Sequence, residues 1–202
     1  GLVKNLFYLS FSKDDVPFQS IILPLGYPTI AFIYGDKQKI VYKEKESFIK
    51  GLVITGQFYG TYDYQVKEKG FNIGIVLHPT ALYKIFKTDV SKLTNQISSI
   101  NKVNKVLADK FETIFINYKN DISTYQEKIF ELLESLPLNL DKDVIQIDEA
   151  INYIIEKDGL LHVKDVINKV LISQKSLETK FKKIVGLTPK KFIRQYRFMN
   201  LI

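Results

Sequence analysis

The residues most suited to chemistry lie in a cationic segment at positions 173–185. Lys175, Glu178 and Thr179 recur at i, i+3 and i+4, a spacing that puts all three on one face of a helix. An amine can donate to guanine and a carboxylate can accept from the amino group of cytosine, so this face carries groups that can read base edges. The opposite face has the apolar spacing of a helix packed on a core, at Leu177, Phe181 and Ile184.

Further polar and basic side chains in the same region suit contacts with phosphates, which set affinity and register without reading sequence. The candidates are Gln174, Lys182, Lys190, Lys191 and Arg194. If they meet DNA, the logarithm of the binding constant should fall with the logarithm of the salt concentration by about 0.9 per neutralised phosphate. The alternative is a solvated helix face whose charge pairs contribute about 0.2–0.5 kcal/mol each.

The elements that would hold these side chains have the pattern of two short helices joined by a tight turn. Residues 163–170 form a short amphipathic segment, and Ser173 is a suitable N-cap for a second helix that we expect to end at Gly186. Thr188 and Pro189 then supply a cap and a preset first turn for a third helix. This arrangement predicts a helix-turn-helix, in which the second helix lies in the DNA major groove.

Charge is distributed unevenly along the chain of 202 residues. The formal net charge is +7, yet residues 160–202 hold ten Lys and Arg against two Asp and Glu. The other 159 residues hold nineteen against twenty. A neutral first part joined to a basic end indicates a sensing or assembly region followed by a region that binds a polyanion.

The sequence around the predicted helix-turn-helix resembles a known family. The run SQKSLETKFKKIVGLTPKKFIRQYRF, residues 173–198, is similar to the first helix-turn-helix of AraC-type bacterial transcriptional regulators. The runs ILPLGYPTIAFIYGD (22–36) and IGIVLHPTALYKIFKTDVSKLT (73–94) resemble the β-rich N-terminal domain of one branch of these regulators. The resemblance implies a sequence-specific regulator that binds double-stranded DNA, with a small-molecule effector or a partner acting at the N-terminal domain.

The sequence departs from the family pattern in three respects. Thr179 stands where the family often has an arginine in the recognition helix, and Ile167 stands where a small alanine is usual. These DNA-binding units also resemble two helix-turn-helix motifs joined by a long helix, and a second copy of the pattern is absent here. We therefore expect a truncation after the first motif, which leaves apolar residues without an evident partner at Phe198, Met199, Leu201 and Ile202.

Upstream of residue 78 the chain reads as short strands, because β-branched and aromatic residues are interrupted by turn residues at strand-length intervals. We expect strands at 6–11, 20–23, 29–34, 40–43, 48–55, 62–67 and 71–77, a helix opening at Pro79, and further helices at 99–118, 122–136 and 144–156. The predicted fold is therefore α+β, with an N-terminal antiparallel barrel or sandwich, then helices, then an all-α helix-turn-helix region.

Three parts are expected within this fold. Residues 1–98 form a sensor-like β-rich domain with its first helix, residues 99–140 form a helical connector, and residues 141–202 contain the helix-turn-helix. A homodimer is expected from the need to reach specific affinity. The amphipathic helices of the connector could supply its interface.

Aromatic residues of the β-rich part are candidates for a small-molecule pocket inside the barrel. They are Tyr27, Phe32, Tyr34, Tyr62 and Tyr64. The alternative interpretation is that such residues are simply core and sheet surface.

Composition argues against several other classes of function. The chain has no cysteine and two histidines, so it lacks thiolate nucleophiles and most zinc ligands. We expect no metal, no cofactor and no enzymatic activity, since no nucleophile and base occur in a credible arrangement. No apolar run approaches the ~20 residues of a membrane span, and cytoplasm is the default location. The alternative function is a small-molecule or protein-binding sensor whose basic end contacts a partner other than DNA.

Overall fold

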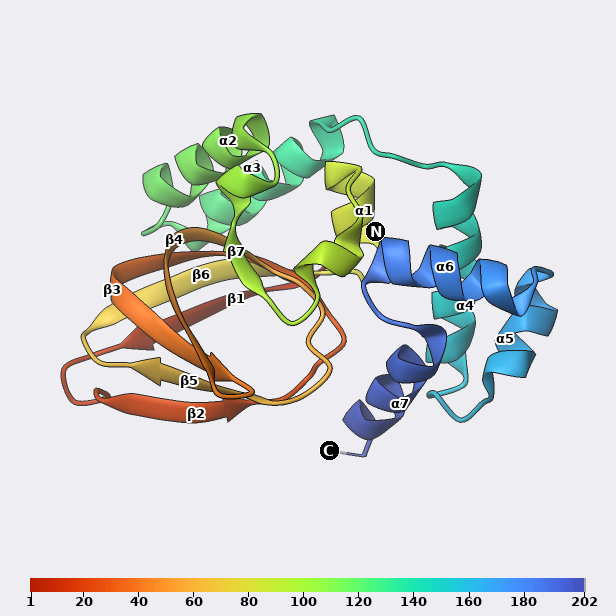
Figure 1. Ribbon diagram of the computed structural model, residues 1–202. Helices are drawn as coiled ribbons and strands as arrows, with labels where there is room; N and C mark the ends of the chain where they lie inside the picture. Colours follow the sequence, from red (N-terminus) through yellow and green to blue (C-terminus); the bar gives the residue numbers. More distant parts are fainter. Residues whose placement is uncertain (202) are drawn as a thin grey trace.

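The computed structural model describes residues 1–201 and shows an antiparallel β-sheet region followed by helices (Figure 1). The strands are β1 (Val3–Phe11), β2 (Phe18–Ile22), β3 (Thr29–Tyr42), β4 (Lys45–Thr55), β5 (Tyr62–Val66), β6 (Gly70–Leu77) and β7 (Ile97–Ser99). The α-helices are α1 (Ala81–Phe86), α2 (Lys105–Asn117), α3 (Ile122–Ser135), α4 (Lys142–Glu156), α5 (Val163–Val170), α6 (Gln174–Val185) and α7 (Pro189–Met199). The predicted α+β class, with the antiparallel sheet at the N-terminal end, is confirmed.

The sheet is bent around its longest strand. Its order is β1-β6-β3-β4-β7, with β5 pairing with β3 and β2 pairing with β5. The first half of β3 pairs with β6 and the second half with β5, and the register against β4 shifts between Ile33 and Gln38. Gly35, at a φ of +89°, lies in that irregular stretch. Because a bulge bends a strand, the sheet curls and encloses one of its own faces.

Two boundaries predicted from the sequence are wrong. The separate strands expected at 29–34 and 40–43 are one strand, because Gly35 and Asp36 form a bulge within β3 and not a loop. The helix expected at 99–118 begins only at Lys105, because the Asn104 side chain caps it by accepting from the Leu107 N–H at 3.0 Å. The residues before it form β7 and a short 3-10 helix, η2 (Ile100–Lys102).

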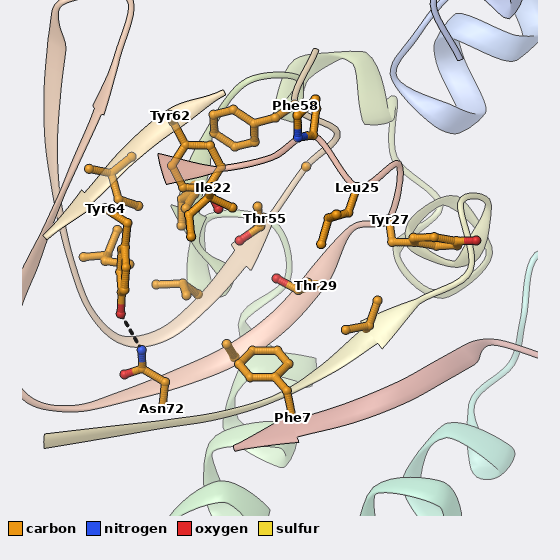
Figure 2. Close-up of a pocket in the computed structure, with 18 of the residues that line it drawn as sticks. Phe7, Ile22, Leu25, Tyr27, Thr29, Thr55, Phe58, Tyr62, Tyr64 and Asn72 are labelled. Carbon is orange, nitrogen blue, oxygen red and sulfur yellow. Dashed lines mark hydrogen bonds between the residues drawn. The ribbon is translucent and has the colours of Figure 1, made fainter. Parts of the chain in front are cut away.

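Alternate residues of the central strands face two different environments, as the two-residue repeat of a strand requires. Thr29 of β3 and Thr55 of β4 point into the space that the curled sheet encloses (Figure 2). Ile30 and Ile54 point to the other side, where the helices lie, and both are fully buried. The helices therefore cover one face of the sheet, and the other face surrounds the enclosed space.

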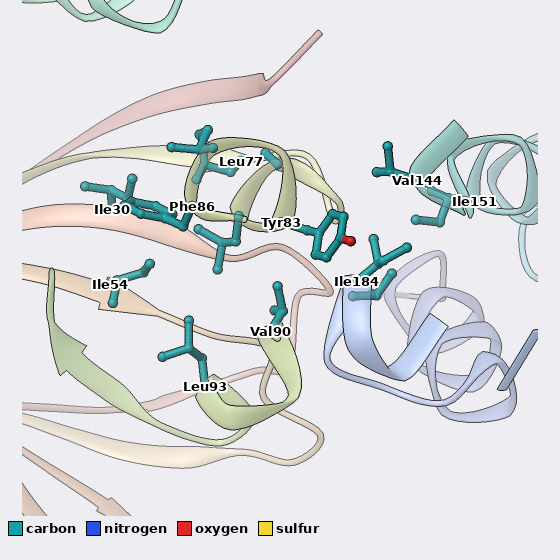
Figure 3. Packing of buried hydrophobic residues seen from close by; sticks show 14 of the residues in the cluster. Ile30, Ile54, Leu77, Tyr83, Phe86, Val90, Leu93, Val144, Ile151 and Ile184 are labelled. Atoms are coloured by element: carbon teal, nitrogen blue, oxygen red, sulfur yellow. The ribbon is translucent and has the colours of Figure 1, made fainter. Parts of the chain in front are cut away.

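The hydrophobic core on the helix side is continuous from the sheet to the C-terminal helices. Figure 3 shows Tyr83 and Val90 between Ile54 of the sheet and Ile184 of α6. Tyr83 belongs to α1, and Val90 to a short 3-10 helix, η1 (Val90–Leu93). The basic C-terminal helices are thus packed directly on the β-rich part.

The C-terminal end is only partly covered. Phe198 and Leu201 are exposed, as their lack of an evident partner predicted. Met199 is half-buried, because its sulfur packs against Gly26 of the loop between β2 and β3. Ile202 lies outside the described residues. Among residues 1–201, no helix has the length and apolarity required to cross a membrane.

Candidate nucleic-acid interface and cavity

Two helices and a three-residue turn form at the positions predicted for the helix-turn-helix. α5 ends at Val170, and Leu171 takes the left-handed conformation, with a φ of +54°. Ser173 then caps α6, since its Oγ accepts from the Ser176 N–H at 3.2 Å. α6 ends at Gly186, whose φ is +92°. The predicted helix bounds, cap and stop are confirmed.

α6 divides its side chains between a buried face and an exposed face. Leu177, Phe181 and Ile184 are fully buried. The base-edge candidates Lys175, Glu178 and Thr179 are exposed, and so are the phosphate candidates Gln174 and Lys182. We call these five residues the α6 surface. Folding brings them together on one accessible helix face, because the apolar repeat directs the opposite face into the core.

A groove borders the α6 surface, between the starts of α5 and α6 and the side of α7. It is lined by the candidates Gln174, Glu178, Lys190 and Arg194, among others. Lys164, in the first turn of α5, also lines the groove and is exposed, although sequence reasoning did not single it out. The sequence signal available for Lys164 was its place in the first turn of the first motif helix. Its position beside the groove is visible only in the folded chain.

Some cations of this region are occupied by contacts within the protein. Lys180 Nζ lies 2.7 Å from Asp143 Oδ1 of α4. Lys191 Nζ lies 4.8 Å from the ring centroid of Tyr59, so this phosphate candidate sits where α7 meets the β-rich part. The Arg197 guanidinium donates to the Gly159 carbonyl oxygen at 3.0 and 2.8 Å and holds the turn between α4 and α5. Net charge therefore overstates the number of cations presented outward.

Specific polar contacts hold the C-terminal helices against the β-rich part. Thr94 Oγ1 donates to the Gly186 carbonyl oxygen at 2.6 Å, and a Cβ on Gly186 would lie 2.9 Å from that hydroxyl oxygen. Lys84 Nζ of α1 lies 2.6 Å from Asp148 Oδ2 of α4, and Thr80 Oγ1 donates to Asp148 Oδ1 at 2.6 Å. These contacts give α4 and α6 a defined position relative to the sheet.

His78 belongs to the same cluster, at the junction between β6 and α1. Its Nδ1 lies 3.1 Å from Thr80 Oγ1. Burial lowers the pKa of His78 to about 4, although the Asp148 carboxylate acts in the opposite direction. His78 is therefore neutral at pH 7 and contributes packing and a hydrogen bond.

The enclosed face of the sheet surrounds a cavity of about 390 Å³ (Figure 2). Three of the aromatic residues predicted to form a pocket, Tyr27, Tyr62 and Tyr64, line it. Phe32 and Tyr34 do not, and their assignment to the pocket was wrong. The Phe32 ring stacks on Phe115 of α2 with centroids 6.1 Å apart, and the Tyr34 hydroxyl donates to the Phe115 carbonyl oxygen. Strand alternation sends both residues to the helix side.

A buried polar network closes one end of the cavity. Asn72 Nδ2 donates to the Tyr64 hydroxyl oxygen at 2.6 Å (Figure 2), and Gln38 Nε2 donates to Asn72 Oδ1 at 2.8 Å. Burial raises the pKa of Tyr64 to about 12, so its hydroxyl is protonated at pH 7. Sequence reasoning missed Gln38 and Asn72, because nothing local distinguishes a buried amide in a strand from an exposed one. Within the described residues, no group of three His, Asp or Glu side chains is placed to hold a metal ion.

Comparison with known proteins gives one match to a family model and several matches to solved structures. A family model described as a domain of unknown function, DUF6597, matches residues 1–99. No curated protein matches the chain.

Similar solved structures include ToxT from Vibrio cholerae O395, at 11% sequence identity and a TM-score of 0.49, covering 97% of this chain and 80% of that one. The AraC-like transcriptional activator CuxR is 15% identical, with a TM-score of 0.35, over 98% of this chain and 74% of that one. Unsaturated fatty acid-bound ToxT from Vibrio cholerae strain SCE256 is 14% identical, with a TM-score of 0.45, over 97% and 78%.

Proposed function

We propose that this chain is a transcriptional regulator that binds double-stranded DNA sequence-specifically through α6, under the control of its β-rich part. The observation that carries the proposal is the α6 surface, which presents polar and cationic side chains outward over a fully buried apolar face. The end of α6 contacts the β-rich part through Gly186, and its start points away from the sheet (Figure 1). The start of the second helix is the part of a helix-turn-helix that meets base edges.

Position on the α6 surface separates the proposed roles. Lys175, Glu178 and Thr179 lie in the first half of the helix and are assigned to base edges. The phosphate contacts are assigned to the flanking side chains, which are Gln174, Lys182, Lys190, Lys191 and Arg194. Glu178 Oε1 accepts from Gln174 Nε2 at 2.9 Å in the free chain, so reading a base with Glu178 requires exchanging that hydrogen bond.

The remaining parts of the chain have proposed roles as well. Residues 1–98 act as the sensor, residues 99–140 as connector, and residues 141–202 as the DNA-binding head. We propose that the protein works as a homodimer joined through α2 and α3. This hairpin carries the exposed apolar residues Val106, Ile116 and Ile122.

The test is selection of a preferred duplex from random DNA, followed by fluorescence anisotropy at several salt concentrations. Lys175→Gln is expected to weaken binding to the preferred duplex by about 1–3 kcal/mol relative to a scrambled one. Lys182→Gln should weaken both duplexes alike and reduce the salt slope by about 0.9. Lys13→Gln removes the same charge from the exposed turn between β1 and β2, outside both the α6 surface and the proposed dimer interface, and should change neither quantity.

Two results would contradict the proposal. One is selection that enriches no sequence, and the other is a salt slope near zero. Either would favour the alternative function, a sensor whose basic end contacts a partner other than DNA.

A further inference from the structure

Among the described residues, no Asp, Glu, Lys, Arg or His lines the cavity inside the sheet, so its lining carries no charged side chain. Burial raises the pKa of Tyr62 and Tyr64 to about 12, so neither hydroxyl ionises near pH 7. An ion transferred into such a space would lose its hydration without gaining an opposite charge from the lining, which is unfavourable. The lining therefore selects against carboxylate and ammonium ions.

The polar groups at the closed end of the cavity already satisfy one another. Gln38, Tyr64 and Asn72 are all buried, and each amide or hydroxyl has a partner within the trio. A ligand does not need to bring a strong hydrogen-bonding group to this end. The apolar walls around it suit a hydrocarbon or aromatic body.

A second polar feature, by contrast, has unused hydrogen-bonding capacity. Thr29 and Thr55 are direct register partners across β3 and β4. Figure 2 shows both side chains in the cavity, nearer the rim than Tyr64, and neither hydroxyl has a hydrogen-bond partner among the described residues. A hydroxyl can both donate and accept, so the pair can bind one neutral hydroxyl or carbonyl group.

The loop between β2 and β3 forms the rim of the cavity and separates the cavity from α7. Leu23 to Tyr27 line the cavity, and a Cβ built on Gly26 would lie 3.4 Å from Met199 Sδ and 3.7 Å from Gln195 Nε2 of α7. Gln57 Nε2 donates to the Gly26 carbonyl oxygen at 2.9 Å. The loop at residues 23–28 thus faces the cavity on one side and α7 on the other.

The contact between this loop and α7 contains buried amide groups without hydrogen-bond partners. Gln195 is 4% exposed, yet among residues 1–201 neither its Nε2 nor its Oε1 has a hydrogen-bond partner, and Gln57 Oε1 also lacks one there. Buried amides without partners are unfavourable, so a small shift of the loop that pairs these atoms would be favoured. The contact between the loop and α7 is therefore suited to a second arrangement.

We propose that the cavity binds an uncharged, largely apolar molecule whose single hydroxyl or carbonyl group meets Thr29 and Thr55, and that loop 23–28 transmits its presence to α7. The inference deepens the proposed function, because α7 belongs to the proposed DNA-binding head. Binding in the cavity is measured without DNA, so its outcome is independent of whether α6 recognises a sequence.

The first experiment compares two probes that differ in charge. N-phenyl-1-naphthylamine, an uncharged fluorophore, is bound to the full chain and displaced with 1-decanol or with decanoate at pH 7. We expect saturable binding of one fluorophore per chain and displacement by 1-decanol at a concentration at least tenfold lower than decanoate. Equal or tighter binding of decanoate would overturn the assignment of an uncharged ligand, and absence of saturable binding would overturn the site.

Variants locate the ligand within the cavity. Thr29→Val and Thr55→Val keep the side-chain shape and should each weaken 1-decanol binding by about five- to tenfold. Ala31→Leu fills the cavity and should reduce binding of both the fluorophore and 1-decanol. Thr113→Val, on the exposed side of α2, is the matched control and should have no effect. Unchanged affinity in both cavity threonine variants would overturn the polar contact.

Hydrogen exchange tests the transmission to α7. With 1-decanol bound, amide protection should change in loop 23–28 and in residues 189–199, while α2 serves as an internal reference without change. Gln195→Leu removes the unpartnered amide; we expect 1-decanol affinity within twofold of the parent chain and a smaller change in α7. Bound 1-decanol without any change in α7 of the parent chain would overturn the transmission.

Discussion

The two faces of the β-sheet are built from the same strands and packed in opposite ways. On the helix side, Ile30 and Ile54 are fully buried in a core that continues through α1 and η1 into α4 and α6. On the enclosed side, Ala31 and Ile49 border a cavity of about 390 Å³. Protein interiors are normally close-packed, so a cavity of this size is a departure that a binding function would explain. The helix side is therefore a continuous core, whereas the enclosed side combines a smaller buried cluster with free volume.

Two isoleucines of β4 provide the sharpest test of this comparison. Ile54→Ala, on the packed face, should lower the free energy of unfolding by about 2–5 kcal/mol, because surrounding side chains cannot fill the space left behind. Ile49→Ala, on the enclosed face, should cost less than half as much, since this side chain already borders free volume. Urea denaturation with a common m-value measures both. Equal losses for the two variants would show that the cavity is closed by packing in solution.

The junction on the packed side should also respond to pH. The pKa of His78 is lowered by burial from 6.5 to about 4. The unfolded chain therefore takes up the proton first as the pH falls, and the stability contributed by neutral His78 is lost between pH 6.5 and 4. We expect a loss of about 1–3 kcal/mol in the parent chain relative to His78→Gln over this interval. Parallel pH profiles for the two proteins would show that His78 is protonated without cost in the folded state.

Enlarging one alanine on each side of the sheet, Ala81 of α1 and Ala31 of β3, gives the smallest contrast. Ala81→Leu, in the packed core, should cost about 1–3 kcal/mol because the added methylene groups force neighbours apart. Ala31→Leu extends into the cavity and should change the free energy of unfolding by less than about 1 kcal/mol. Thermal and urea denaturation of the two variants check the difference. A larger loss for Ala31→Leu than for Ala81→Leu would reverse the comparison.

Local features of the sequence were sufficient for the helix-turn-helix. Ser173, Gly186 and Thr188 act within one turn of the backbone they cap, so their types alone predicted where α6 and α7 begin and where α6 ends. The apolar repeat through Leu177 and Phe181 correctly separated the buried from the exposed side of α6. The same reasoning failed at Gly35, because a glycine that makes a bulge and one that makes a turn look alike in sequence.

The sequence by itself therefore determined the α+β class, a strand-rich first part followed by helices, and the exposed residues of α6, since each depends on side-chain periodicity or on caps acting over a few residues. Only the tertiary structure decided which aromatic residues line the cavity, and it placed Tyr34 on Phe115 and not beside Tyr62. It likewise decided that Lys191 lies over Tyr59 and that Gly26 contacts α7. These pairs are far apart along the chain, and their contact depends on how the sheet curls and where the helices pack, which no local pattern encodes.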